Sequence, residues 1–244
     1  CRKYAEKFVK LQKEQFKRLG VMGDWNNPYL TLNHDYETGI IEVFGKLVEN
    51  GFVYRSKKPI HWCTECRTAL AEAELDYKEK TSPSIFVNFK FSGDNNKFWK
   101  LLKDKPSDFE IVPDEQIHIL IWTTTPWTLP ANLAVALHPE FTYSAIRYKN
   151  PLDGKTQVSV MADSLADDTM NALGIDFYER LGKATGKELE GLTYKHVFNG
   201  KECRLILADY VSISEGTGCV HTAPGHGQDD YISGLKNNLP IISP

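Results

Sequence analysis

Short runs of β-type residues follow one another from about residue 80 to the end of the chain, and this succession constrains the fold most. The runs are rich in β-branched and aromatic residues and are bounded by Pro, Gly, Asn or Asp, which is typical of strands joined by turns. They cover residues 83–91, 116–125, 133–137, 141–148, 156–161 and 203–209. Two helical segments, 164–173 and 228–238, interrupt them. The pattern predicts a mixed α+β domain that is rich in strands.

The first 79 residues have a different character, and we interpret them as a leader segment ahead of a domain at 80–244. Residues 2–19 and 36–50 repeat apolar side chains with the period of an amphipathic helix, and a glycine follows each of them. Residues 52–62 have an extended pattern. The leader is therefore expected to hold two helices and a β-type stretch.

The composition of the 244 residues is that of an ordinary globular protein, with a net charge of −3 and five cysteines. This charge balance does not indicate nucleic acid, so such a partner would have to meet local clusters of Lys and Arg. We interpret the Lys-rich stretch 97–105 as a solvated helix face. The cysteines lack the spacing of a disulfide framework, which favours a reducing, cytoplasmic location. No apolar run reaches about 18 residues, so we expect no membrane span. The chain begins at Cys1 without a signal peptide, and we expect it to be an excised fragment.

A threonine-rich run at residues 122–132 is the first segment that could carry chemistry. Its hydrogen-bonding side chains are Thr123, Thr124, Thr125, Thr128 and Asn132. Threonine hydroxyls both donate and accept hydrogen bonds, which suits recognition of a ribose, an ester or a water molecule. The alternative is that β-branched threonine simply favours a strand. Pro126 and Pro130 favour the functional interpretation, because a plain strand does not need so rigid an exit.

Residues 216–231 form the second such segment and predict a strand, a glycine-rich turn and a helix that begins near Gln228. Junctions of this kind place side chains and free N–H groups at the mouth of a site. The titratable groups are His221, His226, Asp229 and Asp230. As alternatives, either aspartate could only stabilise the helix N-terminus, and either histidine could be structural. A metal site is a further alternative, although the segment lacks zinc-ligand spacing.

Cys63 and Cys66 form a single Cys-x-x-Cys, which is half of a typical zinc site. The remaining cysteines are isolated in the sequence, so either the other ligands belong to a longer parent protein or these are ordinary reduced thiols. The sequence contains no Gly-x-Ser-x-Gly, Walker A or Gly-x-Gly-x-x-Gly motif. If the chain is a hydrolase, we therefore expect its nucleophile to be water.

Residues 123–132 resemble the threonine-rich editing peptide of the class I aminoacyl-tRNA synthetases for isoleucine, valine and leucine, and residues 216–231 resemble the isoleucyl branch. In the leader, residues 54–59 and 62–74 are similar to the part of an isoleucyl enzyme that leads from its Rossmann-type catalytic domain into the editing insertion. The His-Ile-Gly-His and Lys-Met-Ser-Lys-Ser signatures are absent from the sequence. We therefore expect no aminoacylation by this chain, and ATP binding only in the parent protein.

The resemblance implies a barrel-like, β-rich α+β editing domain preceded by a helical and hairpin leader from the catalytic domain. It implies hydrolysis of valine wrongly attached to tRNA(Ile); isoleucyl enzymes are themselves the standard example of an enzyme that needs such a second sieve. By the same resemblance, Asp230 binds the α-ammonium of the substrate and His221 excludes isoleucine. Trp127 and Thr128 shape the side-chain pocket. Adenosine binding and the positioning of water are assigned to Thr123, Thr124, Thr125 and Asn132.

The implied partner is the 3′-terminal aminoacyl-adenosine of tRNA(Ile), bound by a monomer. Editing is expected to need no cofactor, and zinc at Cys63 and Cys66 is expected only in the parent protein. Three alternatives stay open: an editing domain of the valyl or leucyl type, a tRNA 3′-end binding module without turnover, and a zinc-dependent structural module. All editing assignments require Thr124 and Asp230 to share one cleft.

Overall fold

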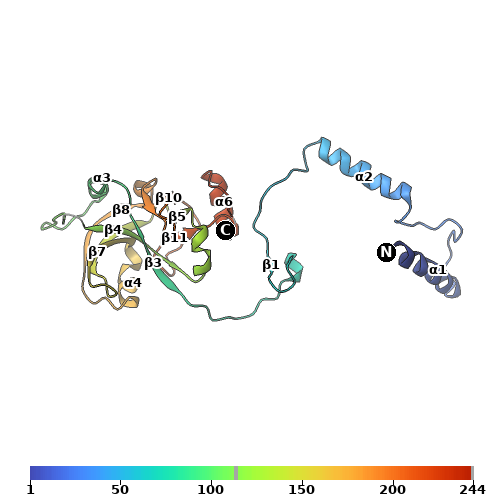
Figure 1. The fold of residues 1–244 in the computed structure, drawn as a ribbon, viewed down its shortest axis with the longest axis horizontal. Coiled ribbons are helices and arrows are strands. Elements are labelled where there is room, and N and C mark those ends of the chain that lie inside the picture. The colour runs from blue at the N-terminus through green and yellow to red at the C-terminus, as the bar shows by residue number, and fades with distance from the viewer. Residues whose placement is uncertain (113–114, 243–244) are drawn as a thin grey trace. The chain divides into compact units, whose positions relative to one another are not determined.

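The computed structural model describes residues 1–112 and 115–242 and divides into two compact units, Cys1–Ser56 and Lys57–Pro244 (Figure 1). The first unit contains α1 (Arg2–Arg18) and α2 (His34–Glu49), which confirm the two predicted leader helices. The guanidinium of Arg2 lies 2.9 Å from the Leu32 carbonyl oxygen and 3.2 Å from the Glu37 carboxylate. Neither helix has a buried residue, and the hydrophobic clusters of the described chain all lie in the second unit. None of the described helices is long and apolar enough to cross a bilayer.

The second unit begins with a small hairpin, β1 (Trp62–Cys63) and β2 (Thr68–Ala69), followed by the 3-10 helix η1 (Glu72–Glu74). The boundary between the two compact units lies after Ser56, so this hairpin belongs to the second unit. The boundary between residues 79 and 80 was drawn where the succession of β-type runs begins in the sequence, and it stays a prediction.

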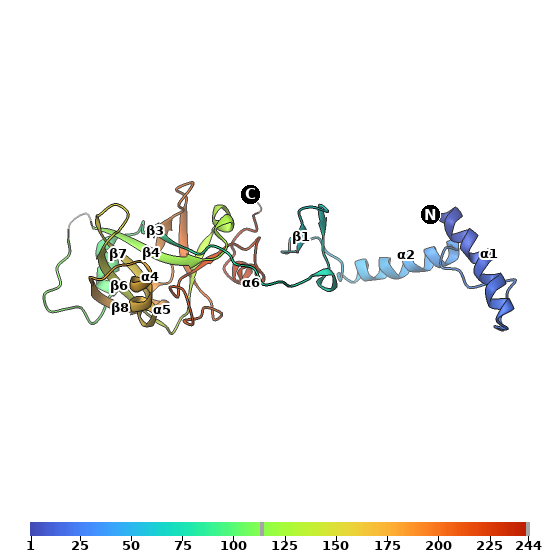
Figure 2. The ribbon, with the colours of Figure 1, turned by 90° about the horizontal axis from the view of Figure 1, so that it is seen from below.

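Five strands form the larger sheet of the second unit, in the order β3-β4-β7-β6-β8. Their bounds are β3 Ile85–Lys90, β4 Gln116–Thr123, β6 Thr142–Lys149, β7 Thr156–Ala162 and β8 Tyr178–Thr185. The β4–β7 pair is parallel and the other pairs are antiparallel. One face is covered by α4 (Ala166–Ala172), whose Met170 packs with Leu120 of β4 and Ile146 of β6 (Figure 2).

Four shorter strands form the second sheet, in the order β11-β5-β10-β9. Their bounds are β5 Ala134–Leu137, β9 Thr193–Lys195, β10 Glu202–Leu207 and β11 Val220–Thr222. The other helices are α3 Asn95–Leu101, η2 Pro126–Ala131, η3 Asp163–Leu165, α5 Gly186–Leu189 and α6 Gln228–Lys236. All six predicted strands are thus present, and the predicted helices at 164–173 and 228–238 correspond to η3 with α4 and to α6.

The main hydrophobic core contains buried side chains from both sheets, among them Phe89 and Ile119 from the larger sheet and Val135 and Leu205 from the smaller. The predicted α+β class is confirmed, but the sheets do not close into a barrel within the described residues. Phe91, just beyond β3, and Tyr194 of β9 make only an isolated bridge between the two sheets. One paired position is too little to continue the hydrogen-bond ladder that a barrel requires.

The register of two strands brings the two motifs together. Along β4, Ile119 and Ile121 belong to the main core whereas Leu120 packs under α4, so the alternation points Thr123 to the main-core side. In the smaller sheet, His221 lies opposite Val135, which also belongs to the main core. The strand end that carries the threonines and the strand that carries His221 therefore face the same space.

Two strands were not predicted, β8 and β9. The sequence of β8, Tyr-Glu-Arg-Leu-Gly-Lys-Ala-Thr, has little apolar alternation and carries charges at three positions. It lies at the edge of the larger sheet beside β6, where its charged side chains form ion pairs at the surface and discourage pairing with another molecule. β9 is only three residues long, which is too short to show a period.

Candidate functional site

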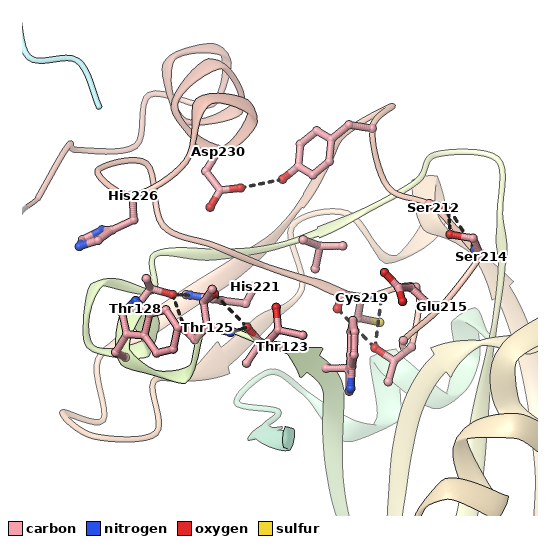
Figure 3. Close-up of a pocket in the computed structure, with 18 residues that line it drawn as sticks. Thr123, Thr125, Thr128, Ser212, Ser214, Glu215, Cys219, His221, His226 and Asp230 are labelled. Atoms are coloured by element: carbon pink, nitrogen blue, oxygen red, sulfur yellow. Dashed lines mark hydrogen bonds between the residues drawn. The ribbon is translucent and has the colours of Figure 1, made fainter. Parts of the chain in front are cut away.

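A cleft of about 490 Å³ opens where β4 ends. The threonine side of the cleft is formed by the β4–η2 segment, and the opposite side by the segment from β11 to α6 (Figure 3). Thr124 and Asp230 both line it, so the spatial requirement of the editing interpretation is met. The two segments also bond directly, since the hydroxyl of Thr128 lies 3.0 Å from Nε2 of His221.

The threonines are held by a rigid turn. Pro126 begins η2, and the N–H of Thr128 donates to the Thr125 carbonyl at 3.1 Å. The hydroxyl of Thr123 accepts the Thr125 N–H at 3.1 Å. Thr124 lines the cleft with no hydrogen-bond partner among the described residues, which leaves its hydroxyl for a ligand. Trp127 is 65% exposed, so it forms the rim of the cleft and not its floor.

His221 is buried and has a partner on each ring nitrogen. Nδ1 lies 2.8 Å from Nδ2 of Asn132, and Nε2 lies 3.0 Å from Oγ1 of Thr128. Burial, reinforced by His226 and His196, lowers the pKa of His221 to about 4. The ring is therefore neutral near neutral pH, and neither nitrogen remains available to take a proton from water.

Asn132 occupies a different place from the one expected. It does not line the cleft, and at 1% exposure it is sealed behind His221. Its amide donates to the Ala134 carbonyl at 2.9 Å and accepts from the Tyr194 hydroxyl at 2.6 Å. Every polar atom of this side chain is thus used within the protein, so its amide supports His221 and does not face an adenosine.

Asp230 lies in the first turn of α6, where the helix dipole favours a negative charge. Its carboxylate accepts the Ala223 N–H at 2.9 Å and the Tyr210 hydroxyl at 3.3 Å. Burial raises the pKa of Asp230, and these two hydrogen bonds oppose that rise because they favour the ionised form. Figure 3 shows Asp230 across the cleft from Thr123 and Thr125.

The neighbouring titratable residues of this motif are placed differently. His226 lies at the edge of the cleft, and its backbone N–H closes the turn by donating to the Ala223 carbonyl at 2.8 Å. Asp229 is exposed in the first turn of α6 and does not line the cleft, which fits the alternative of helix stabilisation.

Several residues that line the cleft were not predicted from the sequence. Those that line it without having been proposed as site residues include Trp122, Tyr210, Ser212, Ser214, Glu215 and Thr217. Most belong to the loop between β10 and β11, where ordinary polar residues in a turn-rich stretch carry no distinctive spacing. Only the glycines at 216 and 218, both at positive φ, mark this loop as conformationally special.

Cys63 and Cys66 lie in the β1–β2 hairpin, outside the residues that line the cleft. The N–H of Cys66 donates to Sγ of Cys63 at 3.3 Å, and hydrogen bonds from Cys66 lower the pKa of Cys63. This favours a thiolate, as a metal ligand requires, at Cys63 only, because the same contact with Cys63 raises the pKa of Cys66. Within the described residues, no group of three or more His, Cys, Asp or Glu side chains could hold a metal, so the pair offers half of a tetrahedral site.

The family model and the similar known sequences both point to the same protein family. Residues 1–219 match the model of tRNA synthetases class I (I, L, M and V), a match that ends before His221. The chain is 48% identical over 244 residues to isoleucine–tRNA ligase of Kosmotoga olearia and 50% identical over 246 residues to that of Thermotoga neapolitana. Both alignments cover 100% of this chain and 24% of the relative, so the chain spans about a quarter of their length.

Two solved structures with a similar fold are editing domains of leucyl-tRNA synthetases. The cytosolic leucyl-tRNA synthetase editing domain of P. knowlesi matches with a TM-score of 0.52 and 16% identity, over 62% of this chain and 60% of that one. The P. falciparum domain in space group P1 matches with a TM-score of 0.52 and 16% identity, over 64% and 68%. At this identity the likeness shows the fold alone.

Proposed function

The chain belongs to the class I tRNA synthetases, and from this premise we propose that it is the editing domain of an isoleucine enzyme, hydrolysing the ester of valine wrongly attached to tRNA(Ile). The relatives that cover the whole chain are isoleucine–tRNA ligases, which favours the isoleucyl type over the valyl and leucyl types. The fold shared with editing domains supports the same assignment.

One observation carries this proposal. A carboxylate and a row of threonine hydroxyls, about a hundred positions apart in the sequence, face each other across one cleft of about 490 Å³. The carboxylate suits the α-ammonium of an aminoacyl ester, because a charge-assisted hydrogen bond is stronger than a neutral one. The hydroxyls suit the ester and the ribose, because they donate and accept.

The cleft residues divide into three roles in this proposal. Asp230 holds the α-ammonium, with its carboxylate oriented by Ala223 and Tyr210. His221 and Thr128 form the wall that rejects the larger side chain, and their mutual hydrogen bond keeps that wall stiff. Trp127 covers the side-chain pocket from the rim. The ester, the ribose and the attacking water are assigned to Thr123, Thr124 and Thr125.

The reaction requires water to attack the ester carbonyl carbon, after which the tetrahedral intermediate releases valine and the ribose hydroxyl. His221 does not serve as the general base, since both nitrogens are bonded and its pKa is lowered to about 4. Catalysis then rests on orienting the water and polarising the carbonyl through the threonine hydroxyls. In this scheme the attacking water gives up its proton through the free hydroxyl of the substrate's ribose, and the departing ribose oxygen receives it.

Editing by this scheme uses no cofactor. The thiol pair at Cys63 and Cys66 would bind zinc only with two further ligands from the longer protein, where the metal would stabilise the hairpin and not take part in hydrolysis. Incubation of the chain with EDTA is accordingly expected to leave the deacylation rate unchanged.

The deciding experiment is deacylation of Val-tRNA(Ile) by the 244-residue chain, with Ile-tRNA(Ile) as the matched substrate. We expect release of valine well above the uncatalysed rate and slower release of isoleucine. Tight binding without release of valine would instead identify a tRNA 3′-end binding module. Threonyl and isoleucyl esters on tRNA(Val) and tRNA(Leu) test the valyl and leucyl types, and preferential hydrolysis of either would replace the isoleucyl assignment.

A further inference from the structure

A chain of hydrogen bonds runs from the buried main core to the wall of the cleft. It starts at the hydroxyl of Tyr194 on β9, which donates to Oδ1 of Asn132 at 2.6 Å. The Asn132 amide lies 2.8 Å from Nδ1 of His221, whose Nε2 lies 3.0 Å from the Thr128 hydroxyl. That hydroxyl donates to the Thr125 carbonyl at 2.9 Å. We call these residues the tyrosine relay.

The direction of every bond in the tyrosine relay follows from its fixed ends. The Ala134 carbonyl, 2.9 Å from the Asn132 amide, can only accept, so the NH₂ group must point to it. The second N–H of that group then points at Nδ1 of His221, which must be unprotonated. At the other end the Thr128 hydroxyl uses its proton on the Thr125 carbonyl and can only accept from Nε2. His221 is thereby held as the neutral tautomer with its proton on Nε2.

Tyr194 holds Asn132 in this orientation. The ring is fully buried, packs against Phe89 with centroids 4.9 Å apart, and does not line the cleft. Burial raises the pKa of Tyr194 well above its ordinary value, so the phenol keeps its proton and remains a donor at neutral pH. If Asn132 turned its amide over, Oδ1 would face the Ala134 carbonyl, and the Tyr194 proton would meet an NH₂ group.

We propose that Tyr194, acting through Asn132, is a positioning residue that sets the size limit of the cleft by fixing the tautomer and orientation of His221. The inference rests on the proposed function, because it deepens the role of the same wall. Without the Tyr194 hydroxyl, only the Ala134 carbonyl still favours the present orientation of the Asn132 amide, so the amide turns more readily, and once turned it accepts from Nδ1 of His221. The ring then loses its Nε2 proton, Thr128 must reverse its hydroxyl, and the wall is no longer stiff.

Tyr194→Phe tests this proposal, because it keeps the buried ring and removes only the hydroxyl. The matched control is Tyr148→Phe, in the larger sheet. Tyr148 is also buried, and its hydroxyl also bonds an amide, that of Gln157 at 2.6 Å, but it has no link to His221. A second relay variant, Asn132→Asp, replaces the donor to Nδ1 by an acceptor at nearly constant volume.

Two readouts are needed on the 244-residue chain. The first is the ratio of deacylation rates for Val-tRNA(Ile) and Ile-tRNA(Ile), with kcat and KM resolved for each. The second is the ¹⁵N spectrum of the His221 ring across a pH titration, which reports which nitrogen carries the proton without any reference to activity.

In the unaltered chain we expect the proton on Nε2 and a titration midpoint near 4. Tyr194→Phe and Asn132→Asp should shift the proton towards Nδ1 and raise that midpoint by about one pH unit or more. They should also lower the valine-to-isoleucine ratio by about tenfold, mainly through faster hydrolysis of Ile-tRNA(Ile). Tyr148→Phe should move neither readout.

Two results would overturn the relay: a His221 ring spectrum in Tyr194→Phe that matches that of Tyr148→Phe, or equal loss of discrimination in both variants. If Tyr194→Phe does not fold, Asn132→Asp decides the question by the same two readouts. Failure of the proposed function is a separate outcome, since the unaltered chain would then release no valine. The ring spectra would still decide whether Tyr194 controls His221.

Discussion

Replacing Asp230 by asparagine removes one charge from the cleft while keeping its shape. The amide oxygen can still accept the Ala223 N–H now held at 2.9 Å, and the Tyr210 hydroxyl can turn to accept from the new NH₂ group. The variant is therefore expected to fold normally. Only the charge that we propose binds the substrate's α-ammonium is lost.

The size of the effect follows from what the carboxylate contributes. A hydrogen bond to a charged group is worth about 1.5–3 kcal/mol. Since about 1.4 kcal/mol corresponds to a factor of ten, kcat/KM for Val-tRNA(Ile) should fall by about 10- to 150-fold. Partial burial of Asp230, which raises its pKa, places the expected loss in the upper part of this range, because a desolvated charge pair is stronger than an exposed one.

The assay is single-turnover release of labelled valine from Val-tRNA(Ile), with Asp229→Asn as the control. Asp229 precedes Asp230 in the same helical turn but is exposed and does not line the cleft, so its loss removes the same charge from the same helix dipole. N-acetyl-valyl-tRNA, which lacks the ammonium, should be hydrolysed equally by Asp230→Asn and by the unaltered chain. Equal rates for Asp229→Asn and Asp230→Asn on Val-tRNA(Ile), or a full loss on the acetylated substrate as well, would refute the ammonium-anchor role.

Three further predictions concern the wall and the loop beside it. His221→Ala should accelerate hydrolysis of Ile-tRNA(Ile) by about 5- to 150-fold, because an extra methylene in a filled site costs about 1–3 kcal/mol; an unchanged valine-to-isoleucine ratio would remove His221 from the wall. Burial lowers the pKa of His221 from 6.5 to about 4, so between these pH values His221 is protonated in the unfolded chain and neutral in the folded chain. The free energy of unfolding, measured in urea, should therefore be highest above about pH 6.5 and should fall by up to about 3 kcal/mol as the pH is lowered to 4. His221→Gln should make the free energy of unfolding less dependent on pH in this range. Gly218→Ala should destabilise the chain by about 2–4 kcal/mol, since φ is +70° and the new Cβ would lie 2.5 Å from that of Ala162. Gly200→Ala, at φ +66° with nothing within 4 Å, isolates the backbone cost of about 1–2 kcal/mol in the same thermal or urea unfolding assay.

Much of the secondary structure could be predicted from local pattern. The strands β4 and β6 are buried along most of their length because both of their faces are covered, and their β-branched and aromatic residues made them predictable from the sequence. β8 could not be predicted in this way, because an edge strand with charged side chains has the composition of a loop. The absence of a closed barrel also lay beyond local pattern, because closure depends on pairing between segments far apart in the chain.

The residue types of the candidate site could be predicted from the sequence, but which of these residues line the cleft and which lie behind its wall could not. The two motifs contain Thr123, Thr128, His221 and Asp230, and all four line one cleft. Asn132 belongs to the same motif and looks equivalent in sequence, yet it is sealed behind the wall. Its position at the C-terminal end of η2, opposite Tyr194, decides this, and nothing in the spacing of the motif indicates it.

The amino-acid sequence by itself determined which chemical groups are present, where most strands and helices lie, and to which family the two motifs belong, because these depend on neighbouring residues. Only the tertiary structure decided that His221 is neutral with both nitrogens bonded, that Tyr210 orients Asp230, and that Tyr194 stands behind Asn132. The physical reason is that protonation and orientation depend on burial and on partners brought in from other strands. The partner of Nε2 on His221, for example, lies 93 positions away in the chain.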